Sequence, residues 1–327
     1  MPIDKKYLDI FANVTSQAAI SSLMLIGKKD KIAADKAAVD SMRKELNKID
    51  MNGRIVIGEG ELDKAPMLYI GENLGTKKGP YLDIAVDPLE GTNFAANNLP
   101  GALSVIAVAE KNNLFNAPET YMNKIAINKN EIGIVDLDFD IKKNIKNLAD
   151  SLNKDISDIT ACILDRPRHK NLIDELKNLK VKLKLITDGD VSGALLVSDK
   201  KYGVDIFLGI GGGPEGVLAA SALDCYDCHF QGRFIFDKDK DIKEARKMGI
   251  TDMEKKYELS EIIKGDSIFC ATAITDCLPM RVNDKDISAL KGIIRNDNNI
   301  FLTETIITHK SFNQKKIIKK KVIFDNF

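Results

Sequence analysis

Two carboxylates and a hydroxyl stand close together in the segment Asp87-Pro88-Leu89-Glu90-Gly91-Thr92. The apolar run 82–86 before them is typical of a buried strand, and Asp87-Pro88 is expected to end it because proline has no N–H for a strand ladder. Glu90-Gly91-Thr92 then turns the chain, and Thr92 can cap a short helix over 93–97. Acids at the end of a strand, beside a helix start that favours an anion, could serve a phosphate or metal site. An ordinary solvated connection fits the same spacing, because short motifs often match by chance.

Three further acids stand beside a predicted strand end or helix start. Glu59 lies between two glycines after the predicted strand 54–57, Asp35 lies in the first turn of a predicted helix over 33–49, and Glu215 lies in a glycine-rich segment. If the strand ends meet, these acids join the two above in a cluster, in which like charges ~4 Å apart repel by about 4 kcal/mol. Divalent cations relieve that repulsion, and oxygen-only ligands suit Mg²⁺ or Mn²⁺. Two such ions can clamp a phosphoryl group and generate hydroxide from bound water. The alternative is a set of surface acids that never meet, and for Asp35 alone a favourable charge at a helix start.

From residue 160 the pattern changes to strands alternating with helices, which predicts parallel strands joined by right-handed crossovers. In such sheets ligands bind outside the carboxyl ends of the strands. The predicted strands are 161–164, 183–186 and 204–208, and the predicted helices are 171–179, 191–197 and 214–223.

Three polar segments follow these strands and should share one rim: Arg166-Pro167-Arg168, Asp188-Gly189-Asp190 and Gly211–Gly216. Two guanidinium groups suit a phosphate, with surface ion pairs as the alternative. The two aspartates suit sugar hydroxyls or a metal, with plain turn chemistry as the alternative. Gly211–Gly216 fits the nucleotide pattern G-x-G-x-x-G, but Glu215 inside it would repel a pyrophosphate, so the segment is interpreted as a metal-ligand loop.

Two other motifs receive no role in the proposed chemistry. Cys225–His229 matches the haem-attachment pattern C-x-x-C-H without supporting features and is interpreted as incidental. The basic run Lys315–Lys321 could bind phosphate backbones, but its apolar interruption favours an exposed terminal strand.

Composition indicates a globular protein of 327 residues, 44% hydrophobic and 29% charged. Lys plus Arg and Asp plus Glu both number 48, so no overall field favours nucleic acid or an anionic membrane. The start of the chain lacks an apolar signal core, and no apolar run approaches a membrane span. Five cysteines without an export signal suggest free thiols, and the protein is expected to be cytoplasmic.

The remaining pattern predicts an α+β N-terminal domain and an α/β C-terminal domain. We predict helices over 7–26 and 65–74, strands over 103–109 and 124–127, a hairpin at Asn112-Asn113, and Tyr121 in a loop. The polar stretch 153–158 predicts a boundary near residue 155. The predicted domains are 1–155, which binds metal, and 156–302, which binds substrate, with terminal strands over 303–327 packing back on the core.

The chain resembles the class II fructose-1,6-bisphosphatases, within the lithium-sensitive (sugar) phosphatase superfamily. The motif D-P-x-E-G-T is shared across that superfamily, whereas GEGE-x-D-x-APM and GGxPEGV are specific to class II. The resembling segments, in family order, are DKIAAD (30–35), IVIGEGELDKAPMLYIGENLG (55–75), DIAVDPLEGT (83–92), NAPETYM (116–122), RPRH (166–169), DGDV (188–191), GIGGGPEGV (209–217) and TETIIT (303–308).

The resemblance implies a layered αβαβα sugar-phosphatase fold with mixed sheets, and hydrolysis of the 1-phosphate of fructose 1,6-bisphosphate in gluconeogenesis. It implies two or more Mn²⁺ or Mg²⁺ ions and a homodimer or homotetramer. The implied metal ligands are Asp35, Glu59, Asp87, Glu90 and Glu215, the implied catalytic residues are Asp87, Glu90 and Thr92, and the implied supporting residues are Lys31 and Asp63. The implied substrate ligands are Glu90, Gly91, Thr92, Tyr121, Arg166, Pro167, Arg168, Asp188, Gly189, Asp190 and Gly212.

Three positions depart from the family pattern. Lys28-Lys29 replaces Arg-Gly before the first acidic helix, Arg166 replaces a lysine, and Asn93-Phe94 replaces Arg-Met. None of these positions is an implied metal ligand. The sequence leaves open a bifunctional sedoheptulose-1,7-bisphosphatase, an inositol or nucleotide monophosphatase, and, in another class, a nucleotide-binding regulatory protein.

Overall fold

The computed structural model describes residues 2–58, 68–282, 285–296 and 299–324, and the chain divides into two compact units. The first unit contains residues 1–116, 263–279 and 285–327, and the second contains 117–262 and 280–284. The boundaries predicted near 155 and 302 lie elsewhere, because strands from the end of the chain complete the sheet that the first 116 residues begin. No described helix has the length and apolar character that a membrane span requires.

The first unit is built on one mixed sheet with the strand order β14-β15-β11-β4-β3-β1-β2, and β16 pairs with β15. β1 and β3 are parallel, and β4 pairs antiparallel with both β3 and β11. The strands are β1 (Asn52–Ile57), β2 (Asn73–Leu74), β3 (Tyr81–Glu90), β4 (Leu103–Glu110), β11 (Ser267–Ala273), β14 (Ile294–Arg295), β15 (Ile300–His309) and β16 (Gln314–Ile323).

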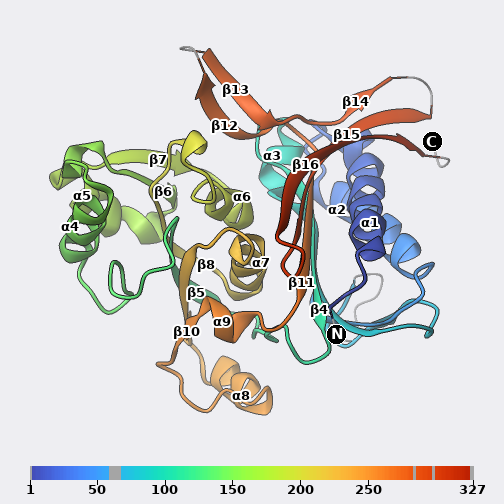
Figure 1. Ribbon diagram of the computed structural model, residues 1–327, viewed down its shortest axis with the longest axis horizontal. Helices are drawn as coiled ribbons and strands as arrows, with labels where there is room; N and C mark the ends of the chain where they lie inside the picture. Colours follow the sequence, from blue (N-terminus) through green and yellow to red (C-terminus); the bar gives the residue numbers. More distant parts are fainter. Residues whose placement is uncertain (1, 59–67, 283–284, 297–298, 325–327) are drawn as a thin grey trace. The chain divides into compact units, whose positions relative to one another are not determined.

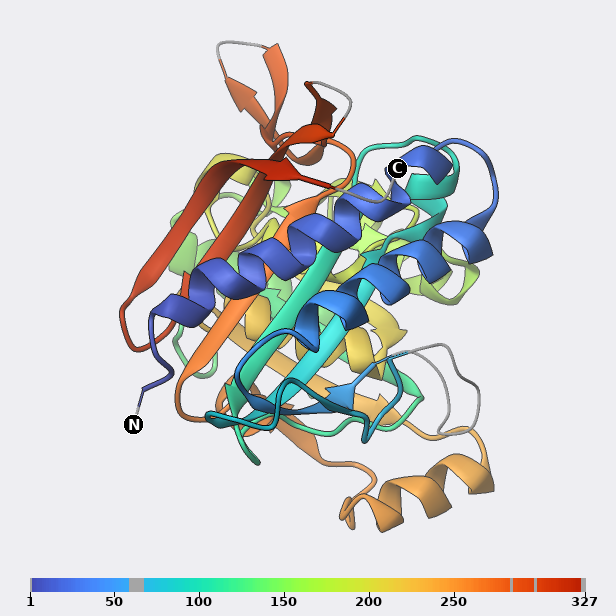
Figure 2. The ribbon, with the colours of Figure 1, turned by 90° about the vertical axis from the view of Figure 1, so that its right-hand side faces the viewer.

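Two long helices lie side by side across one face of this sheet, as Figure 2 shows. They are α1 (Lys6–Ser22), which a short 3₁₀ turn η1 (Leu23–Leu25) extends, and α2 (Lys31–Leu46). The side chain of Asp30 accepts a hydrogen bond from the N–H of Ala33 and caps α2, which begins two residues before the predicted start. Both predicted helices are confirmed, and their apolar faces form one core with the sheet.

The second unit contains a sheet with the strand order β10-β9-β5-β8-β6-β7. β6 is parallel to β7 and β8, which confirms the predicted alternation, but β5 is antiparallel to β8 and β9. The sheet is therefore mixed. The strands are β5 (Tyr121–Ile127), β6 (Thr160–Leu164), β7 (Lys182–Ile186), β8 (Ile206–Gly212), β9 (His229–Ile235) and β10 (Lys256–Glu258).

Helices cover both faces of this second sheet (Figure 1). Ile125 and Leu208 pack in a core with α4 (Ile141–Leu152) and α5 (Lys170–Asn178). Phe207, which neighbours Leu208 and therefore points to the other face, lies against Gly193 of α6 (Asp190–Leu195). The remaining helices of this unit are α7 (Gly213–Leu223), α8 (Asp239–Lys247) and α9 (Leu259–Ile262).

Two predictions of local structure are wrong in the first unit. The helix predicted over 65–74 is absent from its described part, 68–74, which forms a turn and β2, while 65–67 lie outside the described residues. Gly71 has a φ of 94°, which no α-helix allows, and its N–H donates to the carbonyl of Ile55 at 2.8 Å. β3 also does not end at Pro88 but continues to Glu90.

Two predictions after β4 are also wrong. No hairpin forms at Asn112-Asn113, because β4 pairs with β11 rather than with the next strand in sequence. Tyr121 is the first residue of β5 instead of a loop residue, since β5 pairs along its whole length with β8 and β9. A separate two-stranded sheet consists of β12 (Cys277–Val282) and β13 (Lys285–Leu290).

Candidate active site

A bulge in β3 brings the Asp87 and Glu90 side chains to the same face of the sheet. Residues three apart in a regular strand point to opposite faces. Here Asp87 pairs with Val105 and Glu90 with Leu103, so three steps on β3 match two steps on β4. Leu89 lies in the core beneath α1 and α2, which leaves both acids on the opposite face. The bulge also explains why the strand tolerates Pro88, since the regular ladder is interrupted there.

Glycine is required at position 91, between β3 and the short helix α3 (Thr92–Ala96). Gly91 has φ 75° and ψ 49°, a left-handed conformation that other residues rarely adopt. A Cβ there would also lie 2.8 Å from the Phe94 ring. Gly91, rather than the predicted Thr92, is therefore the residue at the helix N-cap. Thr92, which carries the hydroxyl, is the first residue of the helix and follows Glu90 by two residues.

The start of α2 is tied to α3. The Lys31 ammonium donates a hydrogen bond to the Asn93 side chain, and the N–H groups of Gly27 and Lys29 donate to the carbonyls of Ala95 and Ala96 at 2.9 and 3.0 Å. Asp35, partly buried, follows one turn after Lys31, in a helix that contacts both α3 and β3. The helix that carries Lys31 and Asp35 therefore contacts the strand that carries Asp87 and Glu90 and the helix that begins at Thr92.

In the second unit, His169 fixes the arginine loop. Its Nδ1 lies 2.7 Å from the carbonyl oxygen of Leu164, and the N–H of Ile210 donates to its Nε2 at 2.7 Å. These partners require a neutral ring with the proton on Nδ1. Burial lowers the pKa of His169, which agrees with the neutral form. The ring thus links the carboxyl ends of β6 and β8.

The two arginines of this loop reach neighbouring strand ends. A terminal nitrogen of Arg166 lies 3.3 Å from a carboxylate oxygen of Asp188, which follows β7. Nε of Arg168 donates to the carbonyl of Ile210 at 2.8 Å, and its guanidinium lies 4.9 Å from the centre of the Tyr121 ring. The predicted rim is confirmed for Arg166, Arg168 and Asp188, and Tyr121, which was not part of that prediction, lies at the same end of the sheet.

A buried lysine, Lys124 on β5, lies at the centre of this arrangement, and sequence reasoning missed it. Only 1% of its side chain is exposed, and its ammonium bonds the Asp190 carboxylate and the Gly212 carbonyl, the latter at 2.9 Å. Asp190 begins α6 after Gly189, whose φ is 86°. A cation at a strand position is an ambiguous signal in sequence, since its partner lies 66 residues away.

The glycine-rich segment is shaped around two carboxylates. A Cβ on Gly211 would overlap the Asp190 carboxylate, and a Cβ on Gly212 would overlap the Glu215 carboxylate. These acids occupy the space that a pyrophosphate needs in a nucleotide loop, so the geometry disfavours a nucleotide-binding regulatory protein. Burial raises the pKa of Glu215, while the Lys124 ammonium opposes that rise and Asp190 adds to it.

A pocket of about 310 Å³ opens beside these groups. Tyr121, Gly212 and Glu215 line it, with the acidic side chains of Glu119, Asp237 and Asp241. Among the residues the structure describes, Lys238 is the one cation in its lining.

The donor chemistry suits Mg²⁺ or Mn²⁺, since Asp35, Asp87, Glu90 and Glu215 offer carboxylate oxygens alone. Among the residues the structure describes, no three or more acids, histidines or cysteines are grouped closely enough to form a metal site. The predictions for Glu59 and Asp63 lie outside the described residues.

Comparison with known proteins gives a match over residues 5–322 to the family described as "Bacterial fructose-1,6-bisphosphatase, glpX-encoded". A protein of Prochlorococcus marinus (strain NATL1A) is 43% identical over 290 residues, which cover 84% of this chain and 87% of the relative. Its counterpart in strain AS9601 is 44% identical over 279 residues, with 81% and 84% covered. Both are named "D-fructose 1,6-bisphosphatase class 2/sedoheptulose 1,7-bisphosphatase".

Two solved structures show partial likeness. An extragenic suppressor from Pyrococcus furiosus has a TM-score of 0.32 at 11% identity, and an inositol monophosphatase from Anabaena (Nostoc) sp. PCC 7120 has 0.31 at 13%. Each comparison covers 59% of this chain and 71% of the other.

Proposed function

This chain belongs to the family of glpX-encoded bacterial fructose-1,6-bisphosphatases, and on that premise we propose that it hydrolyses the 1-phosphate of fructose 1,6-bisphosphate with the residues described above. The family match over residues 5–322 carries the proposal. The products are fructose 6-phosphate and inorganic phosphate. We further propose a cytoplasmic homo-oligomer that works in gluconeogenesis.

Asp35, Glu59, Asp87, Glu90 and Glu215 are the proposed ligands of Mg²⁺ or Mn²⁺. Bound ions of this kind neutralise phosphoryl oxygens and make a water molecule nucleophilic at neutral pH. Thr92 lies two residues beyond Glu90, and its Oγ1 is proposed to orient the attacking water by a hydrogen bond. The N–H of Gly91, held by the left-handed turn, is proposed to stabilise charge that develops on the phosphoryl group. Lys31 and Asp63 are proposed supporting residues.

The second unit supplies the proposed groups for the non-reacting part of the substrate. Arg166 and Arg168 suit the 6-phosphate, because a guanidinium donates two parallel N–H bonds to phosphate oxygens. The guanidinium of Arg168 lies over the Tyr121 ring, and this contact holds the guanidinium at the rim. The proposed sugar ligands are Asp188, Gly189, Asp190, Gly212 and the backbone at Pro167.

Sedoheptulose 1,7-bisphosphate is a second candidate substrate. The names of both Prochlorococcus relatives include this activity. The sugar bisphosphates share a second phosphate, and the arginine pair offers a binding group for it. A monophosphate such as inositol 1-phosphate has no group for that pair.

The decisive experiment measures the inorganic phosphate that the purified protein releases from fructose 1,6-bisphosphate with Mn²⁺, with Mg²⁺ and with chelator. We expect metal-dependent release of one phosphate per fructose 1,6-bisphosphate, and weak release from inositol 1-phosphate. Asp87→Asn should nearly abolish release, whereas Asp40→Asn, which changes an exposed acid of α2 paired with Lys36, should leave it unchanged. Equal turnover of inositol 1-phosphate would contradict the substrate assignment, and full activity of Asp87→Asn would contradict the proposed metal ligands.

A further inference from the structure

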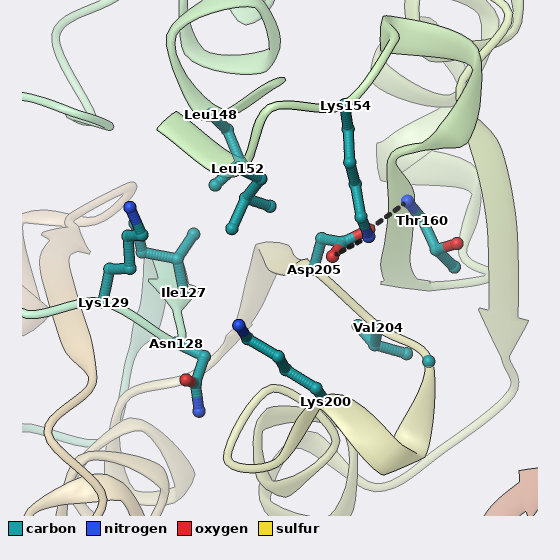
Figure 3. A pocket seen from close by; sticks show the side chains of 11 residues that line it. Ile127, Asn128, Lys129, Leu148, Leu152, Lys154, Thr160, Lys200, Val204 and Asp205 are labelled. Atoms are coloured by element: carbon teal, nitrogen blue, oxygen red, sulfur yellow. Dashed lines mark hydrogen bonds and ion pairs between the residues drawn. The ribbon is translucent and has the colours of Figure 1, made fainter. Parts of the chain in front are cut away.

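A second pocket lies in the second unit, among the strand ends remote from Tyr121 and Gly212. Its volume is about 320 Å³, at the lower end of the range for small-molecule sites. It is lined by the end of β5, the starts of β6 and β8, the last turn of α4, and the 3₁₀ turn η4 (Lys200–Tyr202), as Figure 3 shows.

The lining separates into an apolar part and a basic part. The apolar part consists of the hydrocarbon side chains of Ile127, Leu148, Leu152 and Val204. In the part of the chain that the structure describes, the charged lining residues are three lysines, at positions 129, 154 and 200, and one acid, Asp205, which gives a net charge of +2. A binding partner that matches both parts has an apolar body and a charge of about −2.

Two of the lysines are held in place and keep donors for a ligand. Nζ of Lys154 lies 2.6 Å from Asp205, whose other oxygen accepts the N–H of Thr160 at 2.9 Å. Nζ of Lys129 donates to the carbonyl of Ser151 at 2.7 Å and lies 3.8 Å from Glu131. An ammonium has three N–H groups, so each fixed lysine retains donors beyond these contacts.

Lys200 differs from the other two lysines. Its side chain projects over the cavity in Figure 3, and its ammonium makes no hydrogen bond or ion pair with any described residue. Its ammonium can therefore bind an anion without first breaking an existing pair. The adjacent Lys201, in contrast, is paired with Asp199 at 2.8 Å and is absent from the lining.

The pocket is distinct from the candidate active site. β5 and β8 pair from Tyr121 and Gly212 at one end to Ile127 and Ile206 at the other. Six residue steps along a strand span roughly 20 Å. A small ligand among the lysines therefore does not reach the arginine loop.

We propose that this pocket binds a small organic dianion, with its apolar body against Leu148, Leu152 and Val204 and its anionic groups at the lysines. The ligand class is a dicarboxylate or a phosphorylated molecule with a compact hydrocarbon part. This binding is independent of the substrate groups named under the proposed function.

Isothermal titration calorimetry of the intact, metal-free protein tests the proposal with two probes, phthalate and phenylphosphonate, at a pH where both are dianions. Benzamide, which has the ring without the charge, is the ligand control. We expect saturable binding of at least one dianion and none of benzamide. Lys200→Gln should weaken that binding about tenfold, because it removes one charge-assisted hydrogen-bond donor.

Lys201→Gln is the matched control, since it removes the same charge from the neighbouring position outside the pocket. It should bind the probe as the wild type does. Binding of neither dianion, equal affinity in Lys200→Gln, or an equal loss in Lys201→Gln would overturn the proposal. Equal affinity in Lys200→Gln would assign the anion to another site, such as the arginine loop.

Discussion

At the scale of single residues, one buried lysine compensates the charge of the buried acids in the second unit. Lys124 is the cation among Asp190, Glu215 and the Gly212 carbonyl, and both Lys124 and Asp190 are almost fully buried. Removing one partner of a buried pair leaves an uncompensated charge, which typically costs about 3–5 kcal/mol. Lys124→Met should lower the free energy of unfolding of the second unit by an amount in that range, measured by urea denaturation.

The control for Lys124→Met is the double variant Lys124→Met/Asp190→Asn. Because the second substitution removes the orphaned carboxylate, the double variant should regain a large part of the lost stability. A Lys124→Met protein as stable as the wild type would contradict this account of the ion pair.

His169 gives a pH dependence with a definite sign. Burial lowers its pKa below the ordinary value of 6.5, and the neutral ring accepts the Ile210 N–H. Below pH 6.5 the unfolded chain binds a proton that the folded ring resists, so the contribution of His169 to stability is full above pH 6.5 and is lost as pH falls towards the folded pKa. His169→Gln removes this titrating group. The stability difference between wild type and His169→Gln should therefore shrink as pH falls from about 8 to about 5, and a difference that grows would contradict the neutral assignment.

At the scale of elements, the bulge in β3 explains both a success and a failure of prediction from sequence. The apolar run 82–86 predicts the strand correctly because a buried strand requires apolar residues, and these are visible in the sequence. The continuation through Pro88 could not be predicted, because it depends on β4 offering two residues opposite three. The same mismatch orients Asp87 and Glu90, so their shared face also required the structure.

Gly91, which directly follows β3, is expected to tolerate substitution poorly. Gly91→Ala should destabilise the first unit by about 2 kcal/mol or more, since it combines a left-handed backbone with contact to the Phe94 ring. It should also lower the rate of phosphate release by displacing Thr92. Urea denaturation and steady-state kinetics measure the two effects.

Gly71→Ala is the control for Gly91→Ala. Gly71 also has a positive φ, 94°, but a Cβ there would meet no atom of the described residues within 4 Å. This variant should lose only about 1 kcal/mol and keep its turnover rate. Equal effects of the two substitutions would show that the Phe94 contact adds nothing.

At the scale of the whole molecule, the chain closes its first unit with segments far apart in sequence. β11 pairs with β4 across more than 150 residues, and a buried hydrogen bond of 2.8 Å links Thr15 of α1 to Thr272 of β11. A second bond of 2.8 Å continues from Thr272 to Thr305 of β15. The residue types of one segment do not indicate which distant segment it pairs with. For this reason the polar stretch near 155 predicted a boundary that the contacts place between 116 and 117.

This arrangement makes residues 117–262 a continuous insertion with its own sheet and apolar core. Expressed alone, residues 117–262 should fold and unfold in one cooperative transition, whereas residues 1–116 alone should not, because β4 then exposes the edge that β11 covers. Circular dichroism during thermal and urea unfolding measures both fragments. The fragment 1–155 is the control that separates the two divisions of the chain: it contains β5 without β8 and β9, so it should unfold without cooperativity. A cooperative 1–155 fragment beside an unfolded 117–262 fragment would instead support the boundary near 155.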